Sequence, residues 1–362
     1  MYTILRNYYK ITALIDKHDV LRIIALTWSK LLNLDAQVYA KVSIIDFSEI
    51  EGLSFQDDIQ SITELPDWII NLLSEHYSNE QIIDLSKSFQ QQAPLDLRVN
   101  ILKGDVDSVL AALTQENLSP QLMKFSRYGI RMLNKSFLVK HKLFIDGKIE
   151  IQDESSQLAG LLLNPKRGEM IVDFCAGSGG KTLLIGMLMR NTGRIYAFDV
   201  HEKRLGNLTP RLARSGLSNV HPQLIASEND TKIKRLHGKI DRVFVDAPCT
   251  GLGTLRRNPE LKFRQNLQSL AEINEKQTSI LNSASKLLKV GGYLVYATCS
   301  ILFEENNAIV DKFLETHPDF SMVDASAALG IPELKRNDGY LVLLPNIHQT
   351  DGFFAALLQK TK

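Results

Sequence analysis

The stretch VDFCAGSGGKT at residues 172–182 decides the fold. Its first residues are the end of the apolar run MIVDFC (170–175), which predicts a buried strand. Its last two residues begin KTLLIGMLM (181–189), which predicts a helix. Three glycines lie in the loop between them. Glycine adopts positive φ and has no side chain, so a ligand can approach the backbone closely there. A strand, a glycine loop and a helix in this order are typical of a cofactor site in an α/β sheet.

The glycine loop matches neither common phosphate-binding motif. A P-loop needs glycine at position 175, which is Cys175, and a dinucleotide fingerprint needs glycine at position 182, which is Thr182. Asp199 ends the next apolar run, RIYAFDV (194–200), about 20 residues beyond the loop, where a carboxylate binds ribose hydroxyls. A glycine loop and a ribose acid without a phosphate motif indicate a nucleoside cofactor, of which S-adenosylmethionine is the common example.

Apolar strands alternate with helices from residue 155 onward. Further strands are predicted in DRVFVDAPC (241–249) and GGYLVYATCS (291–300), and a helix is predicted in EKRLGNLTPRLARSG (202–216). Such alternation predicts an α/β fold with a doubly wound, Rossmann-like parallel sheet. Ligands bind at the carboxyl ends of the strands in these sheets. We therefore expect the residues that end these runs to form the site.

The chain divides into three predicted parts. Residues 1–69 read as helices, including SITELPDWIINLLSEHY (61–77), which continues past that boundary with Pro66 near a helix start. Residues 70–150 read as a small α/β unit with a strand in LDLRVNILK, a helix in VDSVLAALTQENL, and a hairpin turned at Asp146-Gly147. Residues 151–362 form the predicted catalytic domain.

Composition limits the classes of function. The chain has 362 residues and a net charge of +1, so a nucleic-acid partner needs a local basic patch. Three distant cysteines without a ligand spacing predict no metal site and no disulfide framework, which fits a cytoplasmic protein. We expect no secretion signal and no membrane span, because charges interrupt every apolar run. We expect a monomer.

Two thiols and a carboxylate are predicted to meet at one rim of the sheet. Asp246 and Cys249 end one strand in DAPC, and Cys299 ends another in TCS. A cysteine inside a core strand is usually a small hydrophobic residue, and this is our interpretation of Cys175. The same interpretation is weaker for the two thiols at strand ends.

A thiol beside a methyl donor indicates methylation of carbon 5 of a cytosine. That carbon is a poor nucleophile until a thiolate adds to carbon 6, and the carbon-5 proton and the thiol must then leave. Asp246 could hold or protonate ring nitrogen 3. Methylation of nitrogen or oxygen needs no thiol. The chemistry requires one thiol and does not choose between Cys249 and Cys299.

The chain resembles the RsmB/Sun family of RNA cytosine-C5 methyltransferases over most of residues 94–354. The resemblance rests on six segments: QDESSQL (152–158), DFCAGSGGKT (173–182), AFD (197–199), DAPCTGLGTLRRNPELK (246–262), YATCSILFEEN (296–306) and DGFF (351–354). It departs from the family at Ser178, where many members have proline.

The resemblance implies roles for individual residues. Cys299 would be the nucleophile and Cys249 would assist release of the product, whereas DNA cytosine-C5 methyltransferases attack with the Pro-Cys thiol. Lys181 would contact the methionine carboxylate or the catalytic aspartates. The residues implied to bind the cofactor are Cys175, Ala176, Gly177, Ser178, Gly179, Gly180, Lys181, Asp199, Asp230 and Asp246, with Glu228 an alternative to Asp230.

RNA is the expected partner, with ribosomal RNA favoured and transfer RNA second. The basic cluster in GTLRRNPELKFR directly after DAPC is predicted to contact phosphates, through Arg256, Arg257, Lys262 and Arg264. The resemblance also implies an RRM-like RNA-binding unit before the catalytic domain, where Arg98 and Asn100 are the candidates.

Two rival functions remain. One is a methyltransferase that acts on another base or on protein, against which both thiols argue. The other is a pseudo-enzyme that binds structured RNA or aids ribosome assembly, against which the intact Gly-Gly-Lys, DAPC and TCS segments argue.

Overall fold

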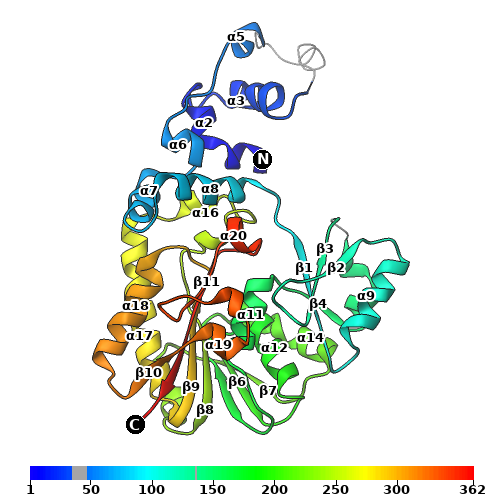
Figure 1. The fold of residues 1–362 in the computed structure, drawn as a ribbon, viewed down its shortest axis with the longest axis vertical. Coiled ribbons are helices and arrows are strands. Elements are labelled where there is room, and N and C mark those ends of the chain that lie inside the picture. Colours follow the sequence, from blue (N-terminus) through cyan, green and yellow to red (C-terminus); the bar gives the residue numbers. More distant parts are fainter. Residues whose placement is uncertain (35–46, 135–136) are drawn as a thin grey trace. The chain divides into compact units, whose positions relative to one another are not determined.

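The computed structural model describes residues 1–34, 47–134 and 137–362 (Figure 1). Within the region 1–69 that is predicted to be helical, most of the segment VYAKVSIIDFSEI (38–50) lies outside these described residues. The chain forms two compact units. Unit 1 contains Met1–Gln92 and Thr254–Leu267, and unit 2 contains Ala93–Gly253 and Gln268–Lys362. The loop that follows the DAPC segment therefore folds with the N-terminal helices.

Unit 1 is helical, as its sequence predicts. Asp19 and Asp58 cap two of its helices, and Ser78 forms a capping box with Gln81 at the start of a third. Pro66 stands just before a helix, where its missing N–H costs no hydrogen bond. The helices are α1 (Tyr2–Arg6), α2 (Tyr8–Thr12), α3 (Val20–Leu26), the π-helix η1 (Thr27–Leu31), α5 (Phe47–Glu51), α6 (Ile59–Thr63), α7 (Asp67–Ser74), α8 (Asn79–Gln90) and α16 (Leu261–Arg264).

Unit 2 begins with a small antiparallel sheet of βαββαβ topology. Its strands are β1 (Leu95–Val99), β2 (Pro120–Leu122), β3 (Gly129–Met132) and β4 (Ile149–Ile151), in the order β2-β3-β1-β4. Helix α9 (Val106–Gln115), the 3₁₀ helix η2 (Leu138–Lys140) and α10 (Lys142–Ile145) complete it. Leu97, Val109 and Ile130 lie in its core. The small α/β unit predicted at residues 70–150 therefore begins only at Ala93, because α7 and α8 belong to unit 1. Residues 254–267, predicted as part of the catalytic domain 151–362, also belong to unit 1.

The predicted hairpin at Asp146-Gly147 is wrong. Residues Lys142–Ile145 form helix α10, whose start is capped by the His141 side chain. Gly147 has a φ of +70°, and the Lys148 amide donates to the Leu143 carbonyl at 2.9 Å, which ends the helix. Strand β4 then pairs with β1, about 50 residues earlier, and not with its neighbour in the chain. The Asp-Gly pair terminates a helix here and does not turn a hairpin.

The large sheet of unit 2 is the predicted doubly wound sheet with an antiparallel addition. Its order is β10-β12-β9-β8-β5-β6-β7, with β11 beside β12. The strands β5 (Met170–Asp173), β6 (Arg194–Asp199), β7 (Val220–Leu224), β8 (Ile240–Asp246) and β9 (Leu288–Thr298) are parallel. The strands β10 (Phe320–Val323), β11 (Leu341–Leu343) and β12 (Phe353–Lys360) are antiparallel to their partners.

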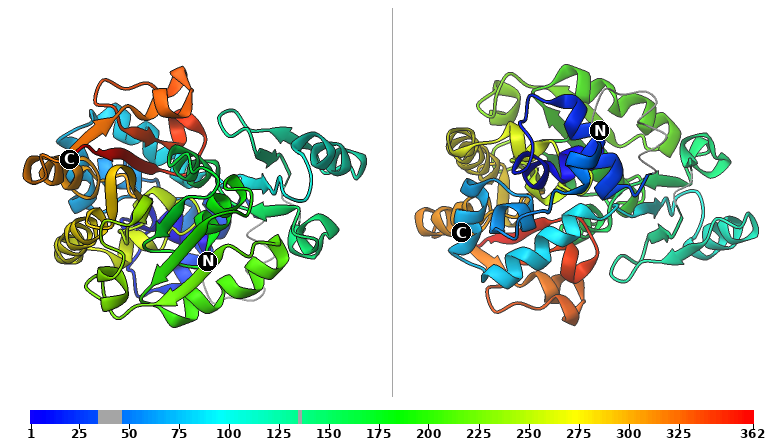
Figure 2. Two further views of the ribbon diagram at one scale, coloured as in Figure 1. Left: turned by 90° about the horizontal axis from the view of Figure 1, so that it is seen from below. Right: turned by 90° about the horizontal axis from the view of Figure 1, so that it is seen from above.

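Helices cover both faces of this sheet (Figure 2). Val295 and Ala297 of β9 face one core cluster, and Leu294 and Tyr296 face the other, as the two-residue period of a strand requires. The helices of unit 2 in this region are α11 (Glu154–Leu162), α12 (Gly180–Leu188), α13 (Glu202–Gly206), α14 (Leu208–Ser215), α15 (Thr231–Lys234), α17 (Leu267–Ser285), α18 (Asn307–Thr316), α19 (Ala325–Leu329) and α20 (Pro345–His348).

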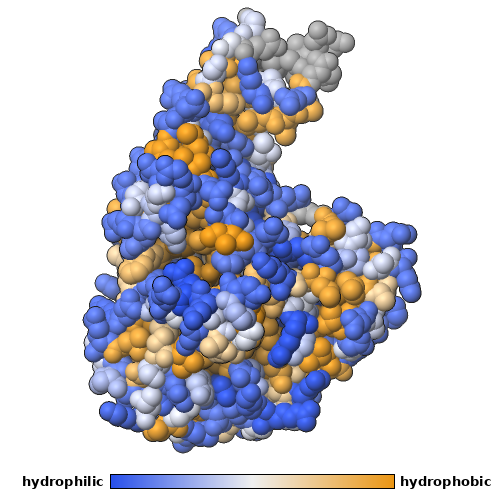
Figure 3. All heavy atoms as spheres, viewed as in Figure 1, coloured by the Kyte–Doolittle hydropathy of each residue, from blue (hydrophilic) through white to orange (hydrophobic). Residues whose placement is uncertain are grey.

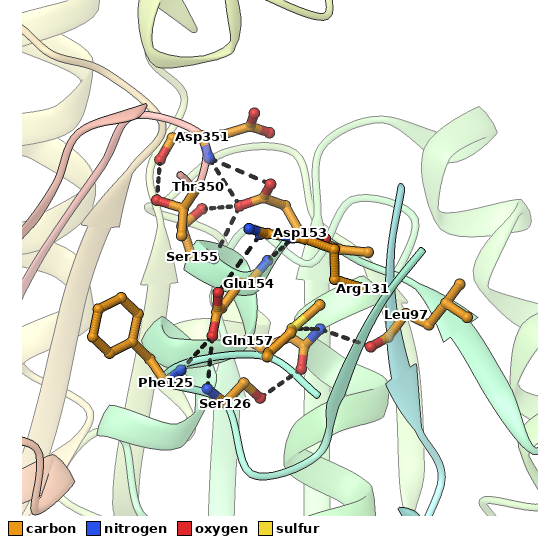
Figure 4. A network of polar contacts seen from close by, with 12 residues as sticks. Leu97, Phe125, Ser126, Arg131, Asp153, Glu154, Ser155, Gln157, Thr350 and Asp351 are labelled. Atoms are coloured by element: carbon orange, nitrogen blue, oxygen red, sulfur yellow. Dashed lines mark hydrogen bonds and ion pairs between the residues drawn. The ribbon is translucent and has the colours of Figure 1, made fainter. Parts of the chain in front are cut away.

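The QDESSQL segment ties the start of α11 to the C-terminal part of the large sheet (Figure 4). The Asp153 carboxylate accepts hydrogen bonds from the Ser155 amide at 2.9 Å and from the Asp351 amide at 3.2 Å. Asp351 lies two residues before β12 in the DGFF segment. A helix cap thus also fixes a strand that lies almost 200 residues further along the chain.

The same segment joins the small sheet to α11 (Figure 4). The buried Glu154 carboxylate accepts from the Phe125 and Ser126 amides at 2.6 and 2.8 Å. Gln157 accepts from the Ser126 hydroxyl at 2.6 Å and donates to the Leu97 carbonyl at 3.3 Å. These bonds satisfy buried polar groups at the joint, which makes the joint costly to open.

Hydrophilic residues cover much of the surface drawn in Figure 3, with hydrophobic side chains scattered between them. In the described parts of the chain, no helix combines the length and the apolar character that crossing a membrane requires.

Candidate functional site

The site lies at the switch point of the large sheet. From β5 the chain winds outward through β6 and β7, and it then returns to the other side of β5 with β8. Ligands of doubly wound sheets bind in the crevice that this reversal opens at the carboxyl ends of the strands. The glycine loop follows β5, and the DAPC and TCS segments follow β8 and β9. The predicted site residues of these three segments are therefore brought to one edge.

The glycine loop leaves room for a ligand. Gly177 and Gly179 have φ values of +55° and +84°, a conformation that side chains disfavour. A Cβ on Gly179 would lie 2.1 Å from Leu208, whereas a Cβ on Gly177 would meet no atom within 4 Å. Gly179 is thus required for packing, and the backbone of Gly177 faces open space. The exposed Ser178, where the family often has proline, leaves this geometry intact.

Asp199 is tied to the glycine loop. It is buried at the end of β6, and its carboxylate accepts from the Gly177 amide at 2.8 Å and from the His201 amide at 2.7 Å. Ala176 next to the loop donates its amide to the Phe198 carbonyl at 2.9 Å. The position of Asp199 beside the loop agrees with the residue spacing that predicts a ribose acid.

Asp230 and Glu228 have different surroundings. Asp230 caps the short helix α15, accepting from the Lys232 and Ala226 amides at 2.9 Å each. The Glu228 carboxylate accepts from Lys276 at 2.6 Å and from the Ser279 hydroxyl at 2.7 Å. Burial opposes ionisation of Glu228, but these two partners outweigh it and lower its pKa to about 2. Both carboxylates have protein partners that explain their placement.

Lys181 and Asp246 form an ion pair with an Nζ–Oδ2 distance of 2.7 Å. Burial disfavours the ammonium, but the Asp246 carboxylate outweighs burial and raises the pKa of Lys181. A thiolate at Cys299 raises it further. The ammonium also lies 5.2 Å from the centre of the Phe353 ring. Lys181 is therefore a charged group that interacts with both Asp246 and Cys299.

Asp173 at the end of β5 is a buried acid with one free oxygen. Its Oδ2 accepts from the Thr182 hydroxyl at 2.6 Å, while its Oδ1 has no partner in the described structure. Burial raises the pKa of Asp173 to about 7, and the charges of Asp246 and Asp199 add to the rise. An uncompensated buried acid beside the loop is typical of a binding site.

The two strand-end thiols face each other. The Sγ atoms of Cys249 and Cys299 lie 3.4 Å apart, close enough for one thiol to donate to the other. The contact with Cys299 and burial raise the pKa of Cys249 well above its usual range. Cys249 thus stays protonated at neutral pH. Cys175 packs against the core on the α17 side of the sheet, and burial raises its pKa too, as expected for a structural cysteine.

Glu305 connects the loops that carry the two thiols. Its buried carboxylate accepts from the Thr250 amide at 2.8 Å and from the Thr250 hydroxyl at 2.5 Å. It also accepts from the Ser300 hydroxyl and from Gln277 Nε2, the latter at 3.1 Å. Thr250 follows Cys249 directly, and Ser300 follows Cys299 directly. One side chain therefore positions both cysteine backbones.

Further bonds hold the same two loops. Gln277 Nε2 also donates to the Pro248 carbonyl at 2.9 Å, and the Gly253 amide donates to the Cys299 carbonyl at 2.9 Å. Burial raises the pKa of Glu305, against the opposing effect of its hydrogen bonds. The sequence alone predicts no role for Glu305. The only signal was its place in YATCSILFEEN, which gives no indication that the carboxylate is buried.

The structure corrects the prediction that Arg98 and Asn100 contact RNA. Both are buried, with exposures of 2% and 4%. Arg98 donates to Gln152 and to the Gly180 carbonyl, the latter at 2.8 Å, and burial lowers its pKa to about 10. Asn100 donates to the carbonyls of Gly147 and Ser215, at 3.0 Å each. These residues attach the small sheet to the large domain.

The basic cluster after DAPC lies in unit 1 and contains two buried cations and two that are at least partly exposed. Lys262 is buried, donates to the Glu64 carbonyl at 2.7 Å, and has its pKa lowered by burial to about 8. Arg256 is also buried, and its carbonyl accepts from Arg6 at 2.8 Å. The prediction that Arg256 and Lys262 bind phosphates is therefore wrong, because a buried cation cannot reach RNA. Arg264 is exposed and Arg257 is partly exposed.

Comparison with known proteins gives the chain its family. The model of the 16S rRNA methyltransferase RsmB/F family matches residues 160–359, and an RsmF/B-like ferredoxin-like domain matches residues 65–139. The solved structure of PH0851 is similar over 99% of this chain and 88% of that chain, with a TM-score of 0.83 and 27% identity. These matches span both the small sheet and the large domain of unit 2.

Curated relatives agree with the family models. Probable ribosomal RNA small subunit methyltransferase B of Bacillus subtilis (strain 168) is 32% identical over 301 residues, which is 82% of this chain and 67% of that protein. Its namesake from Synechocystis sp. (strain ATCC 27184 / PCC 6803 / Kazusa) is 35% identical over 302 residues, 82% of this chain and 66% of that protein. The chain spans about two thirds of the length of these relatives. It belongs to the RsmB/F family of 16S rRNA methyltransferases.

Proposed function

We propose that this protein methylates carbon 5 of a cytosine in small-subunit ribosomal RNA, with S-adenosylmethionine as the methyl donor. The observation that carries the proposal is the pair of thiols, with Sγ atoms 3.4 Å apart, at the carboxyl edge that also holds the glycine loop. Carbon-5 methylation is the base methylation that needs a thiol. Family membership supports methylation of ribosomal RNA.

The residues around the glycine loop fit the cofactor. The open space beside Gly177 admits a ligand to the backbone, and the Asp199 carboxylate next to it suits ribose hydroxyls. The Lys181 ammonium suits a carboxylate such as that of the methionine moiety. When bound, S-adenosylmethionine supplies an electrophilic methyl group. The remaining chemistry falls to side chains of this chain.

Cys299 is the proposed nucleophile, and Cys249 its partner. Because its pKa is raised, Cys249 keeps its proton at neutral pH and can donate a hydrogen bond to a thiolate at Cys299. The Lys181 ammonium favours that thiolate electrostatically. Cys299 Sγ adds to carbon 6 and makes carbon 5 nucleophilic. After methyl transfer the carbon-5 proton passes to water, the electron pair of that C–H bond re-forms the double bond between carbons 5 and 6, and the bond between sulfur and carbon 6 breaks. Cys299 leaves as a thiolate, and Cys249 assists this release by donating a hydrogen bond to the departing sulfur.

Asp246 is the proposed contact for the base. Its carboxylate stands at the end of β8, which leads to Cys249 and pairs with β9, the strand that leads to Cys299. The Lys181 ammonium holds this carboxylate. In the protonated state it would donate to ring nitrogen 3, which gains electron density when the thiolate adds. The charged Lys181 lies next to this carboxylate and can supply the proton that Asp246 passes on. Lys181 and Asp246 therefore act at ring nitrogen 3 of the cytosine, and the two thiols act at carbon 6.

Arg257 and Arg264 remain proposed RNA contacts, as the residues of the basic cluster that are at least partly exposed. We propose ribosomal RNA ahead of transfer RNA as substrate, no metal requirement, and a monomeric protein. Methylation that continues in the presence of a chelator, and a single-chain mass in solution, are the expected results.

The direct test uses the purified protein, methyl-labelled S-adenosylmethionine and unmodified small-subunit rRNA transcribed in vitro. We expect 5-methylcytidine on nucleoside mass spectrometry, and bisulfite sequencing of rRNA and tRNA from a deletion strain to locate the target. A label on another position of the base, or on protein, would refute the carbon-5 assignment. Failure to bind S-adenosylmethionine in calorimetry would favour the pseudo-enzyme.

A further inference from the structure

Unit 2 has a basic hollow away from the catalytic edge. Its volume is about 290 Å³, close to the lower end of the range for ligand pockets, roughly 300–1,000 Å³. Four cations line it: Arg127, Lys166, Arg167 and Arg190. Its other described lining residues are neutral, and one of them is the aromatic Tyr128. We call this feature the basic hollow.

Tight turns present three of the four cations. The Gly129 amide donates to the Ser126 carbonyl at 3.0 Å, so Arg127 and Tyr128 are the central residues of a β-turn. A second turn runs from Lys166 to Glu169, with 3.5 Å between the Glu169 amide and the Lys166 carbonyl. Lys166 begins this turn and Arg167 is its first central residue. Side chains at the corners of turns point outward, and the four cations are all exposed.

The turns are attached to the buried joint between the small sheet and α11. Ser126, which starts the first turn, is bonded to Glu154 and Gln157 of α11. The second turn begins four residues after the end of α11. Arg190, the cation that lies on neither turn, is held by the hydrogen bond that it donates to the Ile101 carbonyl at 3.4 Å. The backbone that carries the cations is therefore preorganised, which lowers the entropic cost of binding.

The positive charge in the hollow has few protein partners. Among the described residues, Arg167 makes no hydrogen bond or ion pair, and the Arg127 guanidinium only lies over the Tyr128 ring at 5.0 Å. The acid next in sequence, Glu169, is taken by Arg242 at 2.7 Å. Two free guanidinium groups and an aromatic ring face one hollow, so an anion there would find unused donors.

The hollow is separate from the catalytic site. Residues 164–167 lead into the amino end of β5, whereas the glycine loop and both thiols lie at the carboxyl ends of their strands. A ligand in the hollow is thus at the opposite end of the sheet from the reacting base. It cannot be the target cytosine or the cofactor.

We propose that the basic hollow binds phosphodiester groups of the RNA substrate at a distance from the target cytosine. Arginine matches phosphate geometry with paired N–H donors, and an aromatic ring beside arginines is suited to an adjoining sugar or base. This proposal rests on the proposed function, because it assumes that RNA is the substrate. An acidic protein surface is the competing occupant, and it predicts no change in RNA binding.

The test is the salt dependence of binding to unmodified small-subunit rRNA, with Arg127→Glu/Arg167→Glu compared with wild type. Each phosphate contact contributes roughly 0.7 to 0.9 to the slope of log K against log salt. We expect the slope to fall by about 1.5 and the affinity near 150 mM salt to fall about 10-fold or more. The matched control is Arg235→Glu/Lys286→Glu, which makes the same charge change at two exposed cations outside the hollow.

The outcomes are distinct. An unchanged slope, or an equal loss in the control variant, overturns the proposal, because the first shows no phosphate contact and the second only a net-charge effect. Equal thermal midpoints and equal binding of S-adenosylmethionine confirm that the variants are folded. If wild type forms no 5-methylcytidine while the slope still falls in the hollow variant alone, the proposed function fails and the hollow still binds RNA. If methylation occurs and the slope is unchanged, only the hollow is wrong.

Discussion

Cys249 and Cys299 are 50 positions apart in the chain, yet their Sγ atoms lie 3.4 Å apart. The contact with Cys299 and burial raise the pKa of Cys249. In the proposed mechanism Cys249 keeps its proton and donates to a thiolate at Cys299, which separates the roles of helper and nucleophile. The first two predictions test that separation.

Cys299→Ala is expected to abolish methylation, because no group remains to add to carbon 6. Binding of S-adenosylmethionine should stay within about twofold of wild type, since the glycine loop and Asp199 are untouched. Nucleoside mass spectrometry and calorimetry measure the two effects. Full activity in this variant contradicts the nucleophile assignment.

Cys249→Ala is expected to accumulate a covalent complex with RNA, because addition still occurs while release is impaired. The complex appears as a slowly migrating band on a denaturing gel. The control is Cys249→Ala/Cys299→Ala, which should give no such band. If the double variant forms the adduct as well, another nucleophile is responsible.

Glu305→Gln is expected to slow methylation about 100-fold while S-adenosylmethionine binds normally. The amide replaces a carboxylate oxygen with a donor that faces the Thr250 or Ser300 donors, so both cysteine loops shift, and small misplacements cost about that much in rate. The free energy of unfolding should fall by about 1–3 kcal/mol.

The readout specific to positioning at Glu305 is the rate of adduct formation in the Cys249→Ala background, which should fall with the overall rate. Glu315→Gln makes the same chemical change at an exposed position of α18 and should be silent. A stability loss without any change in adduct rate would make Glu305 merely structural.

Asp199→Ala is expected to weaken S-adenosylmethionine binding about 10- to 100-fold. It removes the proposed ribose contact and the bond that holds the Gly177 amide, and hydrogen bonds to a charged group contribute about 1.5–3 kcal/mol each. Asp230→Ala is the comparison, because this carboxylate caps α15. Calorimetry that finds equal losses in both variants would give Asp230 a direct cofactor role.

Asp173→Asn is expected to change how stability depends on pH. The native carboxyl, with its pKa raised to about 7 by burial, holds its proton more tightly than the unfolded chain does. Between about pH 4 and pH 7 the native state therefore binds more protons, and this group makes stability fall as pH rises. Above pH 7 the whole penalty is present.

The asparagine variant lacks that slope, which is at most about 1.4 kcal/mol per pH unit. Denaturant titrations at pH 5, 6 and 7 measure the free energy of unfolding of the variant and of wild type. Other acids with a raised pKa, such as Glu305, contribute equally to both proteins and cancel in the difference. Parallel curves for the two proteins would mean that Asp173 stays ionised throughout.

The sequence predicts the catalytic edge well because each residue there is marked by a pattern in its own stretch of the chain. The run MIVDFC, the glycines after it and Asp199 at the next strand end each reveal their position through periodicity and spacing. The same holds for the strands that end at Asp246 and Thr298. Where parallel strands end, their last residues must meet, so the convergence of both thiols follows from the fold class alone.

Burial between distant segments is what the sequence does not reveal. Arg98 alternates with apolar neighbours in LDLRV as an exposed strand residue would, yet its face of the strand lies against Gln152 and Gly180. Lys262 stands in a run of charges, yet Glu64 of unit 1 covers it. Glu305 likewise becomes visible only when two loops separated by 50 residues are seen to share it.

The bonds around the thiols also dictate an order of assembly during synthesis. The loop that carries Cys249 is fixed by Glu305, and the carbonyl of Gly253 accepts from the Gly352 amide at 2.8 Å, about 100 residues further along the chain. The glycine loop, by contrast, finds its hydrogen-bond partners within residues 98–211. On the ribosome, the cofactor half can therefore acquire its native bonds well before the thiols do. The bonds around Cys249 can be complete only once residue 352 has left the ribosome.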